Sequence, residues 1–210
     1  MTSLLLLGAT GLVGRCVLQL ALQDPGVGRV VAPTRQPLPP HPRLVNPRPD
    51  FGQLPADADW WAVDAVVCAL GTTMRKAGSR AAFYRIDHDV PLQAARIALS
   101  RGARAYALNS ALGADPQSRV FYSRTKGELE RDLQALGYPS LTLVRPGLIG
   151  GARGESRPAE QLGIWVSQCL RPLLPKRYRV VAAERIAQQL LAAALEARPG
   201  VHVVPPEAMA

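Results

Sequence analysis

The stretch Ser3-Leu-Leu-Leu-Leu7-Gly8-Ala-Thr-Gly11-Leu-Val-Gly14 places four leucines directly before three glycines at three-residue spacing. The leucines predict a strand buried on both faces, and residues 12–23 have the apolar spacing of a helix. Glycines at a strand-to-helix turn lack the Cβ atoms that would block a phosphate, and the helix start offers free N–H groups to it. This context favours a dinucleotide-binding turn over the alternative, a tight turn that holds no ligand. The predicted contacts are Gly8, Thr10, Gly11, Leu12, Val13 and Gly14.

Strands and helices alternate along the rest of the chain. Further strands are predicted at residues 29–32, 64–70, 103–109, 141–144 and 201–204, with a short extended piece at 44–46. Helices are predicted at residues 80–100, 119–136, 159–170 and 184–197. Strands separated by helices need right-handed crossovers, which give a doubly wound, mostly parallel α/β Rossmann sheet with helices on both faces. In such a sheet, ligands bind at the carboxyl ends of the strands.

The length of the chain bounds its domain organisation. With 210 residues, 48% of them hydrophobic, the chain can bury one sizeable core and is short for two. We therefore expect a single NAD(P)-binding Rossmann domain over residues 1–210, with a small substrate-side region at residues 147–180. Residues 33–55 carry eight of the 19 prolines and are predicted to form a rigid surface excursion rather than a linker.

The composition argues against several other kinds of protein. The formal net charge is +9, but the 22 arginines are dispersed and aromatic residues make up only 5% of the chain, so no nucleic-acid partner is expected. A nucleic-acid or membrane-surface patch stays as a lower alternative. No apolar run approaches the roughly 20 residues of a membrane span. The three cysteines and three histidines lack metal-ligand spacing, so no metal site is expected, and a cytoplasmic location is the simplest expectation.

The residues after the second predicted strand bear on which dinucleotide fits. In NAD-dependent folds, an acidic residue about 20 positions beyond the glycines binds the adenosine ribose and repels a 2′-phosphate. No acidic residue occurs between Asp24 and Asp50, whereas Arg35 stands just beyond the second strand. A guanidinium can hold a phosphate with two hydrogen bonds, so NADP(H) is the predicted cofactor, with Arg35 as the selecting residue and Arg15 as a second donor. The alternative for Arg35 is a solvated loop cation.

A tyrosine and a lysine lie one helical turn apart in Tyr122-Ser-Arg-Thr-Lys126. A fixed cation beside a phenol favours the phenolate, so the pair could exchange a proton with a substrate near neutral pH. Ser110 ends the preceding predicted strand, where its hydroxyl could hydrogen-bond a substrate carbonyl and polarise it. We therefore take Ser110, Tyr122 and Lys126 as the candidate catalytic residues. The alternative for Tyr122 and Lys126 is an ordinary pair on an amphipathic helix.

Together these motifs resemble those of the short-chain dehydrogenase/reductase superfamily: the glycine turn, Ser110, the Tyr122 and Lys126 pair, and Arg145-Pro146-Gly147 after the next strand. More narrowly, the chain resembles the atypical branch that includes the Tat-interacting oxidoreductase-like proteins. The resemblance spans most of the chain and rests on the segments Leu70-Gly71-Thr72-Thr73, Lys76-Ala77-Gly78, Gly113-Ala114-Asp115, Lys126-Gly127-Glu128 and Glu155-Ser156-Arg157-Pro158.

The resemblance implies roles for individual residues. Lys126 would hold the nicotinamide ribose, Tyr122 would exchange the proton and Ser110 would orient the carbonyl. At one position the chain departs from the superfamily, whose extended members often have Asn in the helix after the fourth strand, where this chain has Asp87. The resemblance therefore does not carry that residue's proton relay over to this chain. The other implied cofactor contacts are the backbone around Leu70 and Gly71 at the adenosine ribose, Asp50 at the adenine and Pro146 at the nicotinamide, and Thr72 is a further predicted cofactor contact.

Two functions follow from the sequence. The first is an NADP(H)-binding oxidoreductase that transfers a hydride between NADPH and a carbonyl or alcohol of a small substrate. The alternative is a regulatory or scaffold protein that senses NADP(H), binds a protein partner and turns over no substrate, because fold and function can separate. The complete Ser, Tyr and Lys set favours the first. Substrate contacts are expected from the variable loops at residues 73–79 and 150–157, so the substrate and the oligomeric state stay open.

Overall fold

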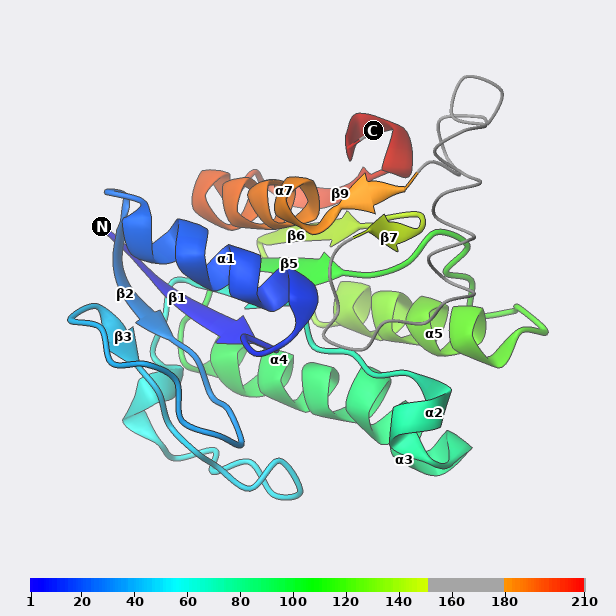
Figure 1. Ribbon diagram of the computed structural model, residues 1–210, viewed down its shortest axis with the longest axis horizontal. Coiled ribbons are helices and arrows are strands. Elements are labelled where there is room, and N and C mark those ends of the chain that lie inside the picture. The colour runs from blue at the N-terminus through cyan, green and yellow to red at the C-terminus, as the bar shows by residue number, and fades with distance from the viewer. Residues whose placement is uncertain (151–179, 210) are drawn as a thin grey trace.

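A seven-stranded sheet forms the centre of the computed structural model, which describes residues 1–150 and 180–209 (Figure 1). The strand order is β3-β2-β1-β4-β5-β6-β9, and every neighbouring pair is parallel. The order changes direction beside β1, where a doubly wound sheet opens its ligand crevice. The strands are β1 (Thr2–Leu7), β2 (Val27–Val31), β3 (Leu44–Val45), β4 (Ala65–Cys68), β5 (Ala105–Asn109), β6 (Ser140–Val144) and β9 (Gly200–Val204).

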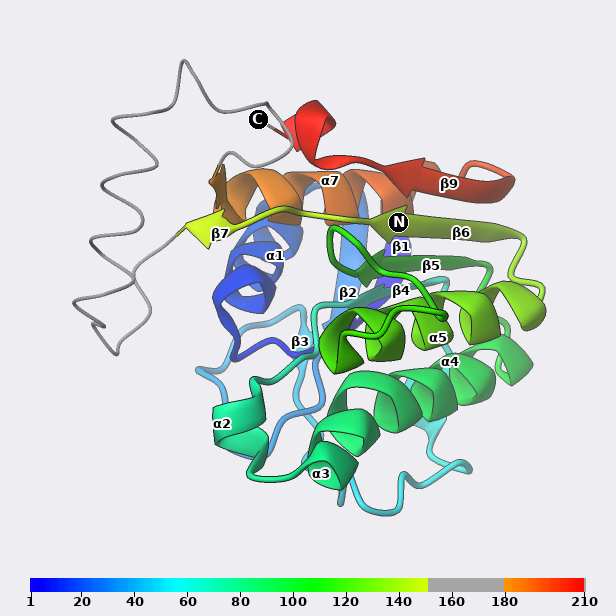
Figure 2. The same ribbon diagram turned by 90° about the vertical axis from the view of Figure 1, so that its right-hand side faces the viewer.

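Helices cover both faces of this sheet, as Figure 2 shows. On one face α1 (Leu12–Gln23) packs beside α7 (Ala183–Glu196), and on the other lie α4 (Val90–Ser100) and α5 (Phe121–Ala135). This arrangement confirms the predicted Rossmann-type α/β fold in a single domain. A separate small sheet pairs β7 (Ile149–Gly150) with β8 (Val181–Ala182). The short helical segments of the described chain are η1 (Asp59–Trp61), α2 (Met74–Ala77), α3 (Arg80–Tyr84), η2 (Arg85–Asp89) and η4 (Pro206–Met209).

The leucines of β1 explain why both faces are covered. Leu4 and Leu6 are fully buried on the side of α1 and α7, whereas Leu5 and Leu7 are buried on the side of α4 and α5. Because successive side chains of a strand point to opposite faces, an unbroken apolar run requires a helical layer on each. Full burial of each such side chain stabilises the fold by about 1.5 to 3 kcal/mol.

Two polar side chains attach the proline-rich excursion to the sheet. The carboxamide of Asn46 donates a hydrogen bond to the backbone oxygen of Ala32 at 2.6 Å and accepts one from the N–H of Leu38 at 2.9 Å. The guanidinium of Arg43 donates to three backbone oxygens at the C-terminal end of α1 and just beyond it, and so satisfies carbonyl groups that have no partner within the helix. They belong to Leu22, Asp24 and Val27.

The helix predicted at residues 80–100 is divided into three parts. Between α3 and α4, the backbone N–H of Val90 bonds to the carbonyl oxygen of Arg85, five residues back, which makes η2 a π-helical segment. The extra residue leaves the apolar pattern on either side intact, so apolar spacing does not reveal it. The consequence is that Asp87 and His88, adjacent in the chain, are both buried.

The other differences from the sequence predictions are local. The strand predicted at residues 64–70 ends at Cys68, and α2 forms within the loop that follows it. The helix predicted at residues 159–170 and most of the substrate-side region at 147–180 lie outside the described residues. Among the described helices, none is both long and apolar enough to cross a membrane.

Gly127 provides a test of how closely the loop before α5 packs on that helix. A Cβ atom at position 127 would lie 2.2 Å from the carbonyl carbon of Asp115 and 2.3 Å from the nitrogen of Pro116. We expect Gly127→Ala to lower the free energy of unfolding by about 1 to 3 kcal/mol, because the backbone must move apart. Urea denaturation measures this. Gln134→Ala, on an exposed position of the same helix, should change it by less than about 0.5 kcal/mol, and equal effects of the two would contradict the packing.

Candidate functional site

Glycines build the turn between β1 and α1 by allowing two close backbone approaches. Gly8 has a φ of +84°, and a Cβ there would lie 2.7 Å from the backbone of Ala69 and Leu70 at the end of β4. A Cβ on Gly14 would lie 2.0 Å from the carbonyl oxygen of Gly8, which also accepts a hydrogen bond from the N–H of Gly11. Within the described residues no side chain caps α1, and its first turn has no acidic residue. The N–H groups of that turn are therefore available to an anion.

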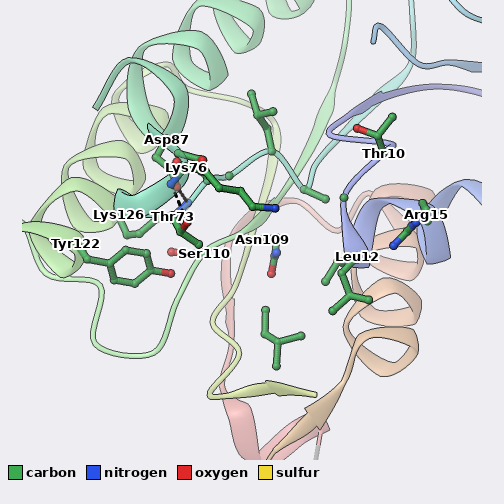
Figure 3. A pocket seen from close by; sticks show the side chains of 17 residues that line it. Thr10, Leu12, Arg15, Thr73, Lys76, Asp87, Asn109, Ser110, Tyr122 and Lys126 are labelled. Carbon is green, nitrogen blue, oxygen red and sulfur yellow. Dashed lines mark hydrogen bonds and ion pairs between the residues drawn. The ribbon is translucent and has the colours of Figure 1, made fainter. Parts of the chain in front are cut away.

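A cavity of about 460 Å³ extends from this turn across the carboxyl ends of β1, β4 and β5 (Figure 3). Its size is within the range of small-molecule sites. Leu12 and Arg15 of α1 lie at one end and Tyr122 of α5 at the other. The lining residues are Thr10, Gly11, Leu12, Val13, Arg15, Ala69, Leu70, Gly71, Thr72, Thr73, Lys76, Asp87, Asn109, Ser110, Tyr122, Lys126 and Ile149.

Lys126 and Asp87 form a buried ion pair at the α5 side of the cavity. The distance from Nζ to Oδ1 is 2.8 Å, and the two side chains are 4% and 1% exposed. The other oxygen of Asp87 accepts a hydrogen bond from the backbone N–H of Thr72 at 2.8 Å. Burial is the largest single effect and lowers the pKa of Lys126, but the charge and hydrogen bond of Asp87, together with the charges of Tyr122 and Cys68, outweigh burial and leave the pKa raised. Lys126 is therefore an ammonium at neutral pH.

Tyr122 and Asn109 reach the cavity from two different elements. The Tyr122 side chain, in the first turn of α5, is 41% exposed, and its ring centroid lies 6.0 Å from that of Phe83. Asn109 comes from the end of β5, and its buried side-chain oxygen has no hydrogen-bond partner among the described residues. A buried acceptor of this kind fits a ligand that donates a hydrogen bond to it. The cavity thus combines an anion-binding turn, a phenol, an ammonium and an unpaired amide oxygen.

The hydroxyl of Ser110 is engaged inside the protein. It donates to Oε1 of Glu130 at 2.5 Å, and Glu130 is held in turn by Arg145, whose Nε lies 3.0 Å from the same oxygen and whose Nη2 contacts the other. The hydrogen bond to Glu130 raises the pKa of Arg145 above its ordinary value. Since a carboxylate only accepts hydrogen bonds, the one hydroxyl hydrogen of Ser110 points to Glu130, and its lone pairs face the cavity. The expected donation from Ser110 to a substrate carbonyl would require this bond to break.

The structure brings together most of the residues that the sequence selected. Gly8 and Gly14 shape the turn without lining the cavity. Arg35 and Asp50 are exposed, Pro146 is buried, and none of these three lines the cavity, so their contacts with a cofactor stay predictions. The predicted residues that do line it are Thr10, Gly11, Leu12, Val13, Leu70, Gly71, Thr72, Ser110, Tyr122 and Lys126, with Arg15 beside them.

Sequence reasoning did not select several residues of the site. Asn109 is the last residue of β5, directly before Ser110. A polar residue at the carboxyl end of a parallel strand could have been selected from the sequence, because ligands bind there. Glu130 follows Lys126 by one helical turn, but its link to Ser110 and Arg145 depends on how α5 packs on the sheet. Ala69, Asp87 and Ile149 also line the cavity without having been selected, whereas Thr73 and Lys76 lie in the loop at residues 73–79 from which substrate contacts were expected.

Solved structures with the same fold include nucleotide-binding enzymes. MoeE5 in complex with UDP-glucose and NAD matches with a TM-score of 0.74 at 18% identity, covering 96% of this chain and 74% of that chain. The UDP-Glc/GlcNAc 4-epimerase from Campylobacter jejuni matches with a TM-score of 0.69 at 14% identity, covering 97% and 77%. The chain therefore has the Rossmann-type α/β fold of these enzymes.

Relatives with similar sequences show which protein family the chain belongs to. Protein fmp52 of Emericella nidulans is 36% identical over 172 residues, which cover 76% of this chain and 72% of the relative. Its counterpart in Aspergillus niger is 36% identical over 170 residues, with the same shares covered. The chain belongs to the Fmp52 family, which confirms the prediction of an atypical family within the short-chain dehydrogenase/reductase fold. No protein-family model matches the chain.

The names of these relatives correct one prediction. The proteins from Emericella nidulans, Aspergillus niger and Candida albicans are all named mitochondrial, which contradicts the cytoplasmic location expected from the sequence. That expectation was wrong because it rested on the lack of an apolar run long enough to span a membrane. Such a lack does not separate the cytosol from other compartments.

Arg145 tests the buried hydrogen-bond network behind Ser110. We expect Arg145→Ala to lower the free energy of unfolding by about 3 kcal/mol or more, because it leaves the carboxylate of Glu130 buried and unpaired. Chemical denaturation measures the change. Arg131→Ala removes an exposed arginine that pairs with Asp132 on the same helix, and it should change stability far less, because solvent screens an exposed ion pair. A small effect of Arg145→Ala, similar to that of Arg131→Ala, would show that Glu130 does not depend on this pairing.

Proposed function

We propose that the chain is an NADP(H)-dependent oxidoreductase that transfers a hydride between NADPH and a carbonyl or alcohol of a small substrate. One observation carries the proposal. A single cavity is lined at one end by the first turn of α1, which no described side chain caps, and at the other by Tyr122 and Lys126. An anion-binding helix start and a group that can exchange a proton are the two parts that such a reaction needs from the protein.

The residues present fit a nicotinamide dinucleotide. The N–H groups at the start of α1 would hold its diphosphate, because Gly8 and Gly14 let the turn close without side chains in the way. The backbone of Leu70, Gly71 and Thr72 would border a ribose, and the unpaired amide oxygen of Asn109 suits a hydroxyl or amide donor. When bound, the nicotinamide ring supplies the hydride chemistry that amino-acid side chains lack.

Tyr122, Lys126 and Ser110 would act on the substrate and the proton. The hydroxyl of Tyr122 would donate a proton to a carbonyl oxygen, or accept one from an alcohol in the reverse direction. The ammonium of Lys126 lies one turn along α5, and its hydrogens that do not face Asp87 would bind ribose hydroxyls. Ser110 would accept a hydrogen bond from the ligand while Glu130 holds its hydrogen.

Charge supports NADP(H) rather than NAD(H). Arg15 lines the cavity beside the phosphate-binding turn, and Arg35 lies exposed just past β2, where the adenosine end of a dinucleotide would lie. The sequence between Asp24 and Asp50 has no carboxylate that would repel a 2′-phosphate. Arginine binds phosphate through two parallel hydrogen bonds, so we propose both arginines as the phosphate contacts.

Nucleotide titration tests the choice of cofactor. We expect NADPH to bind at least about tenfold more tightly than NADH, because a phosphate held by arginine contributes a charge-assisted interaction. Arg15→Ala and Arg35→Ala should each weaken NADPH and leave NADH nearly unchanged. Arg131→Ala removes the same charge from an exposed position of α5 and serves as the matched control. Equal affinity of the unmodified protein for both nucleotides would rule out the NADP(H) assignment.

Tyr122→Phe tests the chemistry separately from binding. We expect NADPH affinity to stay within about twofold, while the rate of NADPH oxidation with a panel of aldehydes and ketones falls by about a hundredfold or more, because the proton donor is lost. Absorbance of the reduced nicotinamide measures the rate. Unchanged turnover would remove Tyr122 from the mechanism. NADPH-dependent capture of a protein partner that persists in Tyr122→Phe, with no turnover of the panel by the unmodified protein, would support the regulatory alternative instead.

A further inference from the structure

Asp87 is a buried carboxylate at the cavity for which the proposed reaction has no step. Its side chain is 1% exposed and lies in η2, the π-helical segment between α3 and α4. A π-helical turn inserts one residue into a helix and often occurs at a functional site. The insertion here is placed where it brings Asp87 to the end of the cavity that holds Lys126.

Asp87 connects two elements that border the cavity. One of its oxygens lies 2.8 Å from Nζ of Lys126 on α5, and the other accepts the backbone N–H of Thr72 in the loop after β4 (Figure 3). Gly71 leaves the space for this junction, because a Cβ there would lie 3.3 Å from Oδ1 of Asp87 and 3.7 Å from Nζ of Lys126. One carboxylate therefore sets the separation between the loop after β4 and the lysine of α5.

The charge of Lys126 depends on this carboxylate. Among the described residues, the ionisable groups whose charges act on its ammonium are Asp87 from η2, Tyr122 from α5 and Cys68 from β4. Burial raises the pKa of the Cys68 thiol, so this group is neutral near neutral pH. Asp87 is therefore the anion that compensates the buried ammonium, and an ammonium buried without such a partner is strongly unfavourable.

We propose that Asp87 is a positioning residue for the nicotinamide ribose, which holds the Lys126 ammonium in place and fixes it to Thr72, so that the ribose subsite is formed before the dinucleotide binds. The inference rests on the proposed function, since it names what orders one part of the same site. It also gives a role to the carboxylate that stands where related proteins often have Asn: here the side chain contacts the lysine directly.

The experiment compares two ligands on two variants. NADPH reaches the nicotinamide end of the cavity, whereas adenosine 2′,5′-bisphosphate lacks the nicotinamide riboside and does not. We expect Asp87→Asn to weaken NADPH about tenfold at neutral pH and to leave adenosine 2′,5′-bisphosphate within about twofold, because only NADPH contacts Lys126. Asp89→Asn removes an exposed carboxylate from the same π-helical segment, one that contacts His88, and should change neither affinity.

The pH dependence separates positioning from a general loss of packing. Without Asp87, burial acts unopposed and the pKa of Lys126 falls, so the ammonium loses its proton as the pH rises. We expect the affinity of Asp87→Asn for NADPH, taken relative to the unmodified protein at each pH, to fall further between about pH 6 and about pH 9. A packing defect alone would give the same ratio at every pH. Isothermal titration at a series of pH values measures this ratio.

A second pair of variants tests whether Asp87 acts through Lys126. Lys126→Gln should weaken NADPH, and adding Asp87→Asn to it should change the affinity no further. In Lys126→Gln the amide can donate a hydrogen bond to Asp87, which also keeps its bond from Thr72, and the double variant has no charge at either position, so the comparison does not need Asp87→Asn alone to fold. The role of Asp87 would be overturned if Asp87→Asn left the NADPH affinity unchanged at every pH. It would also be overturned if Asp87→Asn lowered the NADPH affinity equally in the unmodified protein and in Lys126→Gln. Neither result would contradict the proposed function. An unmodified protein that binds neither ligand would overturn the proposed function and this role with it.

Discussion

The carbonyl oxygen of Gly8 occupies the space that any side chain at position 14 would need. This contact fixes the start of α1 against the end of β1, and the similar approach of Gly8 to Ala69 fixes β1 against the end of β4. In both places two backbone segments lie so close that a Cβ atom would not fit between them. They direct the first turn of α1 across the ends of two strands, where its N–H groups face the cavity. This turn forms one end of the cavity, and the other end is lined by Lys126, Tyr122 and Ser110. A ligand bound at the turn can therefore reach these three side chains.

Two ion pairs, each with a buried carboxylate, hold α5 in register with the rest of the site. Lys126 pairs with Asp87 from η2, and Glu130, one turn further along the helix, pairs with Arg145 just past the end of β6. A sliding or rotation of α5 would separate both pairs at once and leave charges buried without partners. Buried ion pairs often add little net stability but penalise alternative arrangements, so their effect here is on the placement of the helix. Ser110 is drawn into this second pair and oriented by it.

The sequence was sufficient to predict the fold and the two ends of the cavity, because those features depend on local patterns. The leucines at positions 4–7 predict a doubly buried strand, and the spacing of Tyr122 and Lys126 predicts a shared helix face. The partners of Lys126 and Ser110 could not be predicted, since Asp87 and Glu130 meet them only through tertiary packing. The π-helical segment could not be predicted for a related reason. The local sequence does not favour it, and the contact that accompanies it, between Asp87 and Lys126, joins residues far apart in the sequence.

The side chain of Tyr122 is 41% exposed, whereas that of Lys126, four residues along the same helix, is 4% exposed. A phenol at the rim of the cavity can exchange its proton with bulk water directly. With water at the phenol itself, a proton that enters or leaves at Tyr122 needs no chain of buried groups, and Asp87 remains paired with Lys126.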